Sequence, residues 1–333
     1  ILIGEHAVVH GFPAITSTLN LYATCRIKKT KNSHVRIIIS RFNFEDGYSW
    51  GEIKEFWQKI DANYKKFIKT SDYSFIQGNP KRTSGIALIA LQECVSYFKL
   101  KNLPGMTIHG DSDIPVGGFG SSSAAGAAVI VAFLKLMDIA YTKEDVFKIL
   151  YNTESKLFGT VSGVDQTTVL HEGLIEFKKG ENRNDYWKLN IKTKLLKNAI
   201  IVDTGRPKNT TGEVVEHVKA KKLLNPNLVG GIFNEIGQLT EVFKDSLRGN
   251  NKKEFFDAVK RSGELLIKLG IVSKDVQRIV KELEVEGAYT KISGAGTIIG
   301  KGSGSLLVFS DDQKKIEKYL KKNKFNYFVV DLG

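Results

Sequence analysis

A glycine- and serine-rich stretch, Gly117-Gly118-Phe119-Gly120-Ser121-Ser122-Ser123, stands directly before a strongly apolar segment that reaches about Met137. This pattern predicts a tight turn followed by a helix. The free amide groups and the positive dipole end of a helix start favour an anion, so a phosphate group would fit there. The stretch is not a Walker loop, since no GKS or GKT is present, and it is not a GxGxxG opening a βαβ unit. An ordinary tight turn is the alternative, because Gly and Ser populate turns freely.

Two carboxylates follow this stretch, Glu154 late in a predicted helix and Asp165 in a predicted loop over 157–168. Phosphoryl transfer needs a magnesium ligand and a group that orients or deprotonates the attacking hydroxyl, and two carboxylates suit this division of work. The alternatives are a solvated helix carboxylate for Glu154 and a loop-capping role for Asp165.

Two further stretches have residue types that suit a ligand site. Gly4-Glu5-His6-Ala7-Val8-Val9-His10-Gly11 puts a carboxylate and an imidazole directly after an apolar, extended start. Lys291-Ile292-Ser293-Gly294-Ala295-Gly296 is a second glycine-rich turn, which allows close approach of the backbone to another group. For the second stretch, a plain turn before a strand over 305–309 is the alternative.

Taken together, the four stretches resemble, in order and approximate separation, the motifs of the GHMP kinases, the family of galactokinase, homoserine kinase, mevalonate kinase and phosphomevalonate kinase. The resemblance spans essentially the whole chain. Within the family, Gly4–Gly11 looks most like the mevalonate kinases, because galactokinases show an acidic residue and an aromatic after GEH where this chain has Ala7-Val8-Val9. Ser162-Gly163-Val164-Asp165 resembles the stretch that carries the family's catalytic aspartate.

The resemblance implies an α+β, two-domain GHMP kinase fold, with a ribosomal protein S5 domain 2-like N-terminal domain, a ferredoxin-like C-terminal domain and an active site between them. The implied activity is ATP-dependent phosphorylation of the C5 hydroxyl of mevalonate, in isoprenoid biosynthesis. Phosphomevalonate kinase or another GHMP small-molecule kinase is the alternative. ATP and Mg²⁺ are the implied cofactors, and a homodimer is suggested by the resemblance only.

The resemblance also implies a role for each matching residue. Asp165 would be the catalytic carboxylate, and Ser122 and Glu154 would bind Mg²⁺. The remaining roles are ATP binding by Gly117, Gly118, Phe119, Gly120, Ser121, Ser122 and Ser123; support of the phosphate loop by Gly294, Ala295 and Gly296; and substrate binding by Glu5, His6, Asp165 and Thr210, the last from Lys208-Asn209-Thr210, which resembles the family's RNT.

Three features depart from the family pattern. The lysine expected ahead of the first motif would lie before Ile1, and because Ile1-Leu2-Ile3 resembles the inside of a strand, we expect residues upstream of it. The second motif normally reads P-x3-GLGSSAA, and its altered spacing here leaves open which of Ser121, Ser122 and Ser123 meets the metal. Thr297-Ile298-Ile299 replaces the glycine run that usually ends the third motif.

The elements needed to position these residues alternate between strands and helices. Hydrophobic periodicity predicts helices over 51–70, 85–98 with Thr83-Ser84 as a cap, 117–137, 142–156 with a Thr142/Asp145 capping box, 212–222, 227–247, 252–269, 273–284 and 311–322. It predicts strands over 1–3, 13–27, 35–39, 106–109, 174–178, 199–202, 305–309 and 325–331, with a charged hairpin or loop over 179–190. We expect a nucleotide-binding domain over 1–195 and a C-terminal domain over 196–333.

Composition narrows the class of protein further. With 333 residues, 42% hydrophobic content and 31 Gly against 6 Pro, the chain is not disordered, collagen-like or a coiled coil, and it has no apolar run of about 18 residues to span a membrane. The two cysteines favour a reducing cytoplasm and offer no zinc site. The net charge of +13 comes mostly from scattered lysine pairs, which favours general surface charge over nucleic-acid binding. A catalytically silent relative that binds a ligand or RNA is the competing interpretation.

Overall fold

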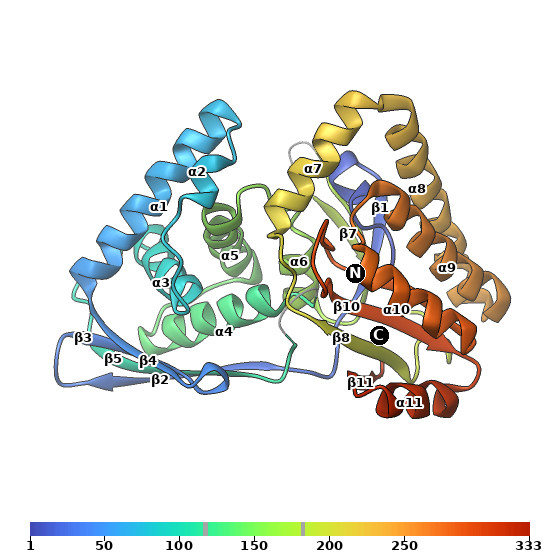
Figure 1. Cartoon of the computed structure of the whole chain (residues 1–333). Coiled ribbons are helices and arrows are strands. Elements are labelled where there is room, and N and C mark those ends of the chain that lie inside the picture. The colour runs from blue at the N-terminus through green and yellow to red at the C-terminus, as the bar shows by residue number, and fades with distance from the viewer. Residues whose placement is uncertain (116–118, 181–183) are drawn as a thin grey trace. The chain divides into compact units, whose positions relative to one another are not determined.

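A computed structural model describes residues 1–115, 119–180 and 184–333 of the chain. Packing divides the chain into two compact units, shown with element labels in Figure 1. Unit 1 contains Ile1–Asn20, Pro115–Phe119 and His171–Gly333, and unit 2 contains Leu21–Ile114 and Gly120–Leu170. This division by packing is not the same as the expected division into domains over 1–195 and 196–333. The domain boundary near residue 195 stays a prediction.

Unit 2 is a four-stranded sheet with helices. Its strands lie in the order β2-β5-β3-β4, in which β3 and β5 are parallel and the other neighbours are antiparallel: β2 (Ala23–Thr30), β3 (His34–Ile39), β4 (Phe44–Ser49) and β5 (Gly105–Ser112). Its helices are η2 (Ser40–Phe42), α1 (Trp50–Thr70), α2 (Ser74–Gln77), α3 (Gly85–Tyr97), α4 (Ser121–Leu136), α5 (Lys143–Phe158) and α6 (Val164–His171). Apolar residues of α3, α4 and α5 form one buried cluster with β3 and β5, and this core fixes the helices that carry Ser122 and Glu154, the expected Mg²⁺ ligands.

The described residues of unit 1 form two antiparallel sheets. The smaller, in the order β1-β6-β7, joins β1 (Pro13–Ser17), β6 (Leu174–Lys178) and β7 (Asp185–Lys188). The larger, in the order β11-β8-β10-β9, joins β8 (Ala199–Gly205), β9 (Ala288–Ser293), β10 (Gly304–Ser310) and β11 (Asn326–Val330). Its helices are η1 (Ala7–His10), α7 (Thr211–Leu224), α8 (Pro226–Gly249), α9 (Lys252–Leu269), α10 (Lys274–Val285) and α11 (Gln313–Lys322).

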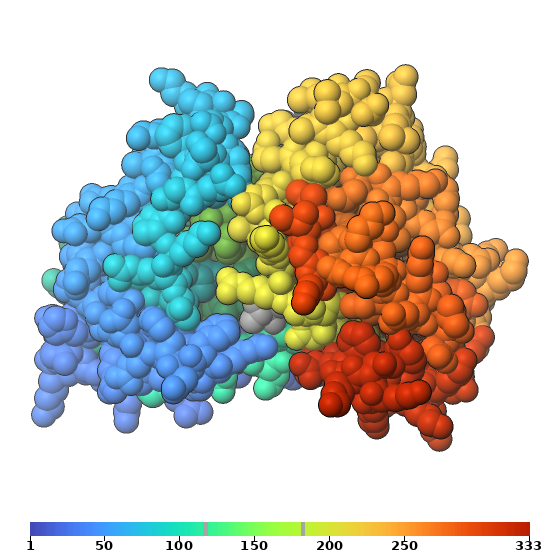
Figure 2. Space-filling view, in the orientation of Figure 1, coloured from blue at the N-terminus to red at the C-terminus, as the bar shows by residue number. Residues whose placement is uncertain are grey.

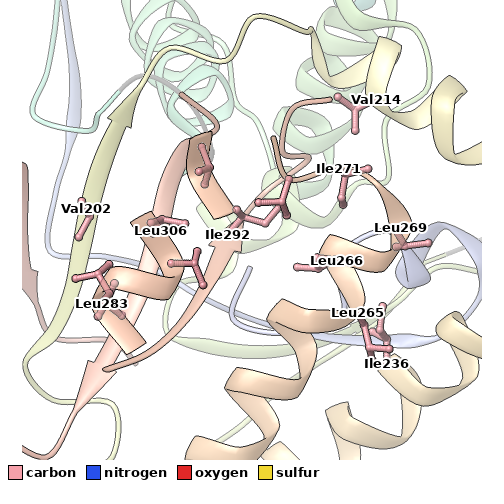
Figure 3. Packing of buried hydrophobic residues seen from close by; sticks show 14 of the residues in the cluster. Val202, Val214, Ile236, Leu265, Leu266, Leu269, Ile271, Leu283, Ile292 and Leu306 are labelled. Carbon is pink, nitrogen blue, oxygen red and sulfur yellow. The ribbon is translucent and has the colours of Figure 1, made fainter. Parts of the chain in front are cut away.

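The core of unit 1 lies between the larger sheet and its helices. Val202, Ile292 and Leu306 from the sheet join Leu266 of α9 and Leu283 of α10 in one buried cluster (Figure 3). Helix α11 buries two residues, and its lysines are exposed. The C-terminal segment that contains α11 is coloured red in Figure 2. In the described part of the chain, no helix has the length and apolar character needed to cross a membrane.

The α+β expectation is confirmed, and so is the capping box at the start of α5, where Thr142 and Asp145 bond each other's backbone amides. Four local predictions are wrong. The strand expected over 1–3 does not form, and Ile3 makes an isolated bridge to Ile15 instead. The strand expected over 13–27 is two strands, β1 and β2, which belong to different sheets. Ser84 does not cap α3 with its side chain, because its hydroxyl lies 2.8 Å from the hydroxyl of Tyr48 instead. The loop expected over 157–168 gives way to α6 from Val164 onward.

Candidate active site

The expected phosphate-binding turn leads into α4 in unit 2. Gly120 is the N-cap of this helix with a φ of 63°, a left-handed conformation that favours glycine. Because Gly120 has no side chain, it cannot cap the amide groups of Ser121, Ser122 and Ser123 in the first turn, and these donors suit an anion. Phe119 is half-buried, whereas Gly117 and Gly118 lie outside the described residues.

Glu154 of α5 is buried beside the start of α4. Its side chain accepts hydrogen bonds from the hydroxyls of Ser122 and Ser123, each at 2.9 Å, and from the side-chain amide of Gln166. Burial, and then the nearby charge of Asp165, raise the pKa of Glu154 to about 7, although the three donors act in the opposite direction. Glu154 is therefore held in place in a protein environment that disfavours its charged form.

Asp165 lies in the first turn of α6, not in a loop. A Cβ placed on Gly120 would stand 3.7 Å from the Cγ and Oδ1 atoms of Asp165, so the Asp165 carboxyl group lies beside the start of α4. The structure thus brings together the helix start, Glu154 and Asp165, as the sequence predicted. It adds Gln166, which sequence reasoning missed, although it directly follows Asp165 in the same motif.

This cluster has the donor chemistry of a magnesium site. Among the described residues no three His, Cys, Asp or Glu side chains gather as a metal site, but Mg²⁺ in phosphoryl-transfer sites needs only one or two carboxylates beside phosphate and water oxygens. The Ser122 hydroxyl donates its hydrogen bond to Glu154, so the lone pairs of the hydroxyl oxygen are available to a cation. The positive charge of a cation would also stabilise the ionised form of Glu154, which burial disfavours. Ser122 and Glu154 fit Mg²⁺ on these grounds.

In unit 1 the stretch over 4–11 contacts the glycine-rich stretch over 291–296. Lys291 of β9 is fully buried, and its ammonium group donates to Glu5 Oε1 and to the carbonyl oxygen of Ile292, the latter at 2.8 Å. Burial lowers the pKa of Lys291, and the charge of Glu5 opposes this effect. Glu5 Oε2 is buried and has no hydrogen-bond partner among the described residues. No role was predicted for Lys291, although it begins the glycine-rich stretch over 291–296.

His6 is also tied to the third motif. Its Nε2 lies 3.0 Å from the carbonyl oxygen of Ala295, and because a carbonyl only accepts, Nε2 carries the proton. Burial lowers the pKa of His6, which favours the neutral ring. Gly296 has a φ of +80°, and a Cβ there would stand 2.2 Å from the carbonyl oxygen of Ile271, so the turn requires glycine at this position. The support of the phosphate loop expected from Gly294, Ala295 and Gly296 stays a prediction.

Thr210 begins α7. Its hydroxyl accepts from the amide of Glu213 at 3.3 Å, and Glu213 accepts from the amide of Thr210 at 2.8 Å, which completes a capping box. Asn209, which was not predicted as a site residue, accepts from the amides of Ile298 and Ile299 at 3.1 and 3.3 Å. Asn209 therefore holds the segment that replaces the family's glycine run. Its position beside Thr210 was the signal available in the sequence.

Comparison with known proteins agrees with this geometry. The family model described as GHMP kinases N terminal domain matches residues 86–173, which include α4, α5 and Asp165. A mevalonate kinase of Methanocaldococcus jannaschii is 29% identical over 335 residues, covering 98% of this chain and 95% of that protein. Residues 86–173 therefore form a GHMP kinase N-terminal domain. The family match explains why the helix start, Glu154 and Asp165 occur together.

Solved GHMP kinases share the fold of the whole chain. The crystal structure of the Methanococcus jannaschii mevalonate kinase has a TM-score of 0.75 at 25% identity and covers 100% of this chain and 95% of that one. The L. major mevalonate kinase, solved with R-mevalonate, has a TM-score of 0.74 at 19% identity, with 100% and 93% coverage. The GHMP kinase fold expected from the motifs is therefore confirmed.

Proposed function

We propose that this GHMP kinase transfers the γ-phosphoryl group of ATP to the C5 hydroxyl of mevalonate and forms 5-phosphomevalonate. The observation that carries the proposal is the cluster in unit 2, where the buried Glu154 accepts from Ser122 and Ser123 at the start of α4, beside Asp165. A metal-binding carboxylate and a second carboxylate beside an anion-binding helix start are the groups that phosphoryl transfer requires. The choice of mevalonate follows from the relatives that carry that name.

In this proposal Asp165 orients the acceptor hydroxyl and takes its proton as the hydroxyl oxygen bonds the γ-phosphorus. The bond from that phosphorus to the β,γ-bridging oxygen breaks, and ADP leaves. The amides at the start of α4 bind the phosphates, a role we assign to Phe119 and Gly120 through Ser123, and to Gly117 and Gly118 from the motif alone. Ser122 and Glu154 would hold Mg²⁺, which neutralises phosphate charge when bound. Most of the rate acceleration then comes from positioning and charge neutralisation, because such transfers leave little covalent chemistry to the protein.

Glu154 must lose a proton to bind a cation. With a pKa of about 7, the side chain is protonated in a substantial fraction of molecules at neutral pH in the absence of a cation. We therefore propose that Mg²⁺ binding releases a proton from Glu154 and weakens as the pH falls below 7.

In unit 1 we assign Glu5, His6 and Thr210 to the acceptor substrate. Glu5 Oε2, which has no partner in residues 1–115, 119–180 and 184–333, is suited to accept from a hydroxyl group. The neutral His6 ring, with its proton on Nε2, has an acceptor at Nδ1. Thr210 is held at the start of α7 by its capping box.

The test is ADP release from MgATP with mevalonate, 5-phosphomevalonate, homoserine and galactose supplied separately. We expect turnover with mevalonate only, and turnover with 5-phosphomevalonate alone would replace the proposed acceptor while keeping the kinase chemistry. Asp165→Asn is expected to lower kcat about 100- to 10,000-fold, the range for loss of a general base, with unchanged ADP binding. Asp138→Asn is the matched control, because Asp138 is exposed and its φ of 55° suits Asn. Normal kcat in Asp165→Asn would remove Asp165 from the mechanism.

A homodimer and a cytoplasmic location stay predictions for this chain. Both cysteines, Cys25 and Cys94, are unpaired in the structure, and a reducing compartment suits them. Light scattering on the purified protein measures the oligomeric state directly, and fractionation of cells measures the location.

A further inference from the structure

Lys291 and Glu5 form a buried ion pair that the proposed chemistry does not yet use. The side chain of Lys291 is 0% exposed and that of Glu5 is 1% exposed. Taking two charges out of water is costly, and buried ion pairs often stabilise a protein no better than apolar residues of similar size. The pair therefore calls for an explanation other than stability.

The position of Lys291 is fixed by the sheet and by the helix that covers it. Lys291 pairs with Leu307 on β10, the neighbouring strand. On α9, a Cβ placed on Gly263 would stand 2.6 Å from the carbonyl oxygen of Thr290 and 3.3 Å from Lys291 Cβ. The absence of a side chain at Gly263 thus lets α9 pack closely against β9 at this point, which confines the stem of Lys291.

The position of Glu5 depends on contacts with the same strand and turn. On one side of Glu5, the hydroxyl of Ser293 donates to the carbonyl oxygen of Ile1 at 3.0 Å. On the other side, His6 bonds the carbonyl oxygen of Ala295. Between them, Glu5 Oε1 accepts from Lys291, which also donates to Ile292. One oxygen of the Glu5 carboxylate is therefore fixed by Lys291.

The second oxygen of Glu5 accepts no hydrogen bond from any residue that the structure describes. This atom, Oε2, is buried. An unsatisfied buried acceptor of this kind is costly, and the cost disappears when a ligand supplies a donor. Since the carboxylate is an acceptor only, the ligand group must be a donor such as a hydroxyl, and a carboxylate or phosphate of the ligand would be repelled.

We propose that Lys291 is a positioning residue for the acceptor substrate, because it fixes Glu5 through Oε1 and leaves Oε2 to accept a hydrogen bond from a hydroxyl group of that substrate. The proposal rests on the proposed function, which assigns Glu5 to the substrate. It deepens that function by naming the group recognised, an alcohol hydroxyl, and the residue that makes Glu5 able to recognise it.

The first test measures KM and kcat of Lys291→Met with R-mevalonate and with MgATP. Loss of a hydrogen bond to a charged group should raise KM for mevalonate about 10- to 100-fold, while KM for MgATP stays within about twofold. Lys244→Met is the matched control in the same unit, because Lys244 is also buried and donates to Glu176 at 2.9 Å. If Lys244→Met shows the same rise in the KM for mevalonate, or Lys291→Met shows none, the proposal is wrong.

The second test asks whether Lys291 acts through Glu5. Glu5→Gln and the double variant Lys291→Met/Glu5→Gln are measured beside Lys291→Met, and the double variant leaves no buried charge unpaired. We expect the double variant to have the mevalonate KM of Glu5→Gln, and a further rise of about tenfold or more would overturn the proposal. The double variant also decides the question if Lys291→Met alone does not fold. Failure of all three variants to fold, with Lys244→Met folded, would assign the pair to stability and overturn the proposal.

Wild-type turnover separates this proposal from the proposed function. If the wild type phosphorylates 5-phosphomevalonate or another of the four alcohols instead of mevalonate, the proposed acceptor is wrong. The same variants are then measured with the alcohol that is used, and the role of Lys291 is confirmed or refuted by the KM for that alcohol.

Discussion

The raised pKa of Glu154 makes a quantitative prediction about stability. The ordinary pKa of a glutamate is 4.5, and burial beside Asp165 raises it to about 7 in the folded protein. The folded state therefore binds this proton more tightly than the unfolded state does. The resulting stabilisation is fully present below pH 4.5 and is lost as the pH rises to about 7.

The size of the effect follows from the two pKa values. A rise from 4.5 to about 7 corresponds to a loss of about 3 kcal/mol in the free energy of unfolding across that pH range. Glu154→Gln has no proton to lose, so it does not show this loss. Its amide group also meets Ser123 and Gln166 differently, but that change in stability is the same at every pH. The difference between variant and wild type should therefore rise by about 3 kcal/mol from pH 4.5 to 7.

The assay is urea unfolding of the wild type and Glu154→Gln between pH 4.5 and 8, without nucleotide or divalent cations. Because other groups titrate alike in both proteins, only the difference between the two free energies is read. Glu144→Gln, which changes an exposed glutamate on the same helix, is the control and should stay within about 0.5 kcal/mol of the wild type. A flat difference for Glu154→Gln would refute the inferred burial effect on Glu154.

Two further predictions concern packing within each unit. In unit 2, Lys156 lies 3.2 Å from the carboxylates of both Asp61 and Glu93. Asp61 keeps a second ion pair, with Lys65 at 2.7 Å, so Lys156→Met takes the cation from the buried Glu93 carboxylate. Urea unfolding should show that the free energy of unfolding falls by about 3 to 5 kcal/mol. A fall below about 1 kcal/mol would contradict this reasoning. In unit 1, Gly263→Ala forces a Cβ to 2.6 Å from a backbone oxygen, whereas Gly126→Ala in unit 2 meets only a leucine methyl at 2.7 Å, which can move. The thermal unfolding midpoint should therefore fall more for Gly263→Ala than for Gly126→Ala. An equal fall would show that the backbone of β9 can move to accommodate the added methyl group.

Much of the fold could be predicted from the sequence because hydrophobic periodicity is strong in the long helices. The expected helix over 252–269 is α9, with the same limits. Prediction failed where local preference and packing disagree. A loop was expected over 157–168, and the β-branched Thr167, Thr168 and Val169 are weak helix formers. Helix α6 nevertheless forms there, with Val164, Thr167 and Thr168 buried in the fold.

The division of the chain into units was also outside the reach of sequence pattern. Strand β1 ends at Ser17, which pairs with Leu174 of β6. Most of the chain between these two residues belongs to unit 2. Hydrophobic periodicity reports which face of a strand is buried, but it does not report which strand lies beside it. The sequence therefore indicated one boundary near residue 195. By packing, the chain instead starts in unit 1, passes through unit 2 and returns to unit 1.

The sequence by itself determined the residue types that the chemistry needs: a glycine start for α4, hydroxyls behind it, and the carboxylates Glu154 and Asp165. Such motifs are local, so spacing along the chain is enough to find them. Only the tertiary structure decided which of three serines reach Glu154, and that Lys291 fixes Glu5. These are contacts between residues distant in sequence, and their energies depend on burial and on the geometry of neighbours that no local pattern encodes.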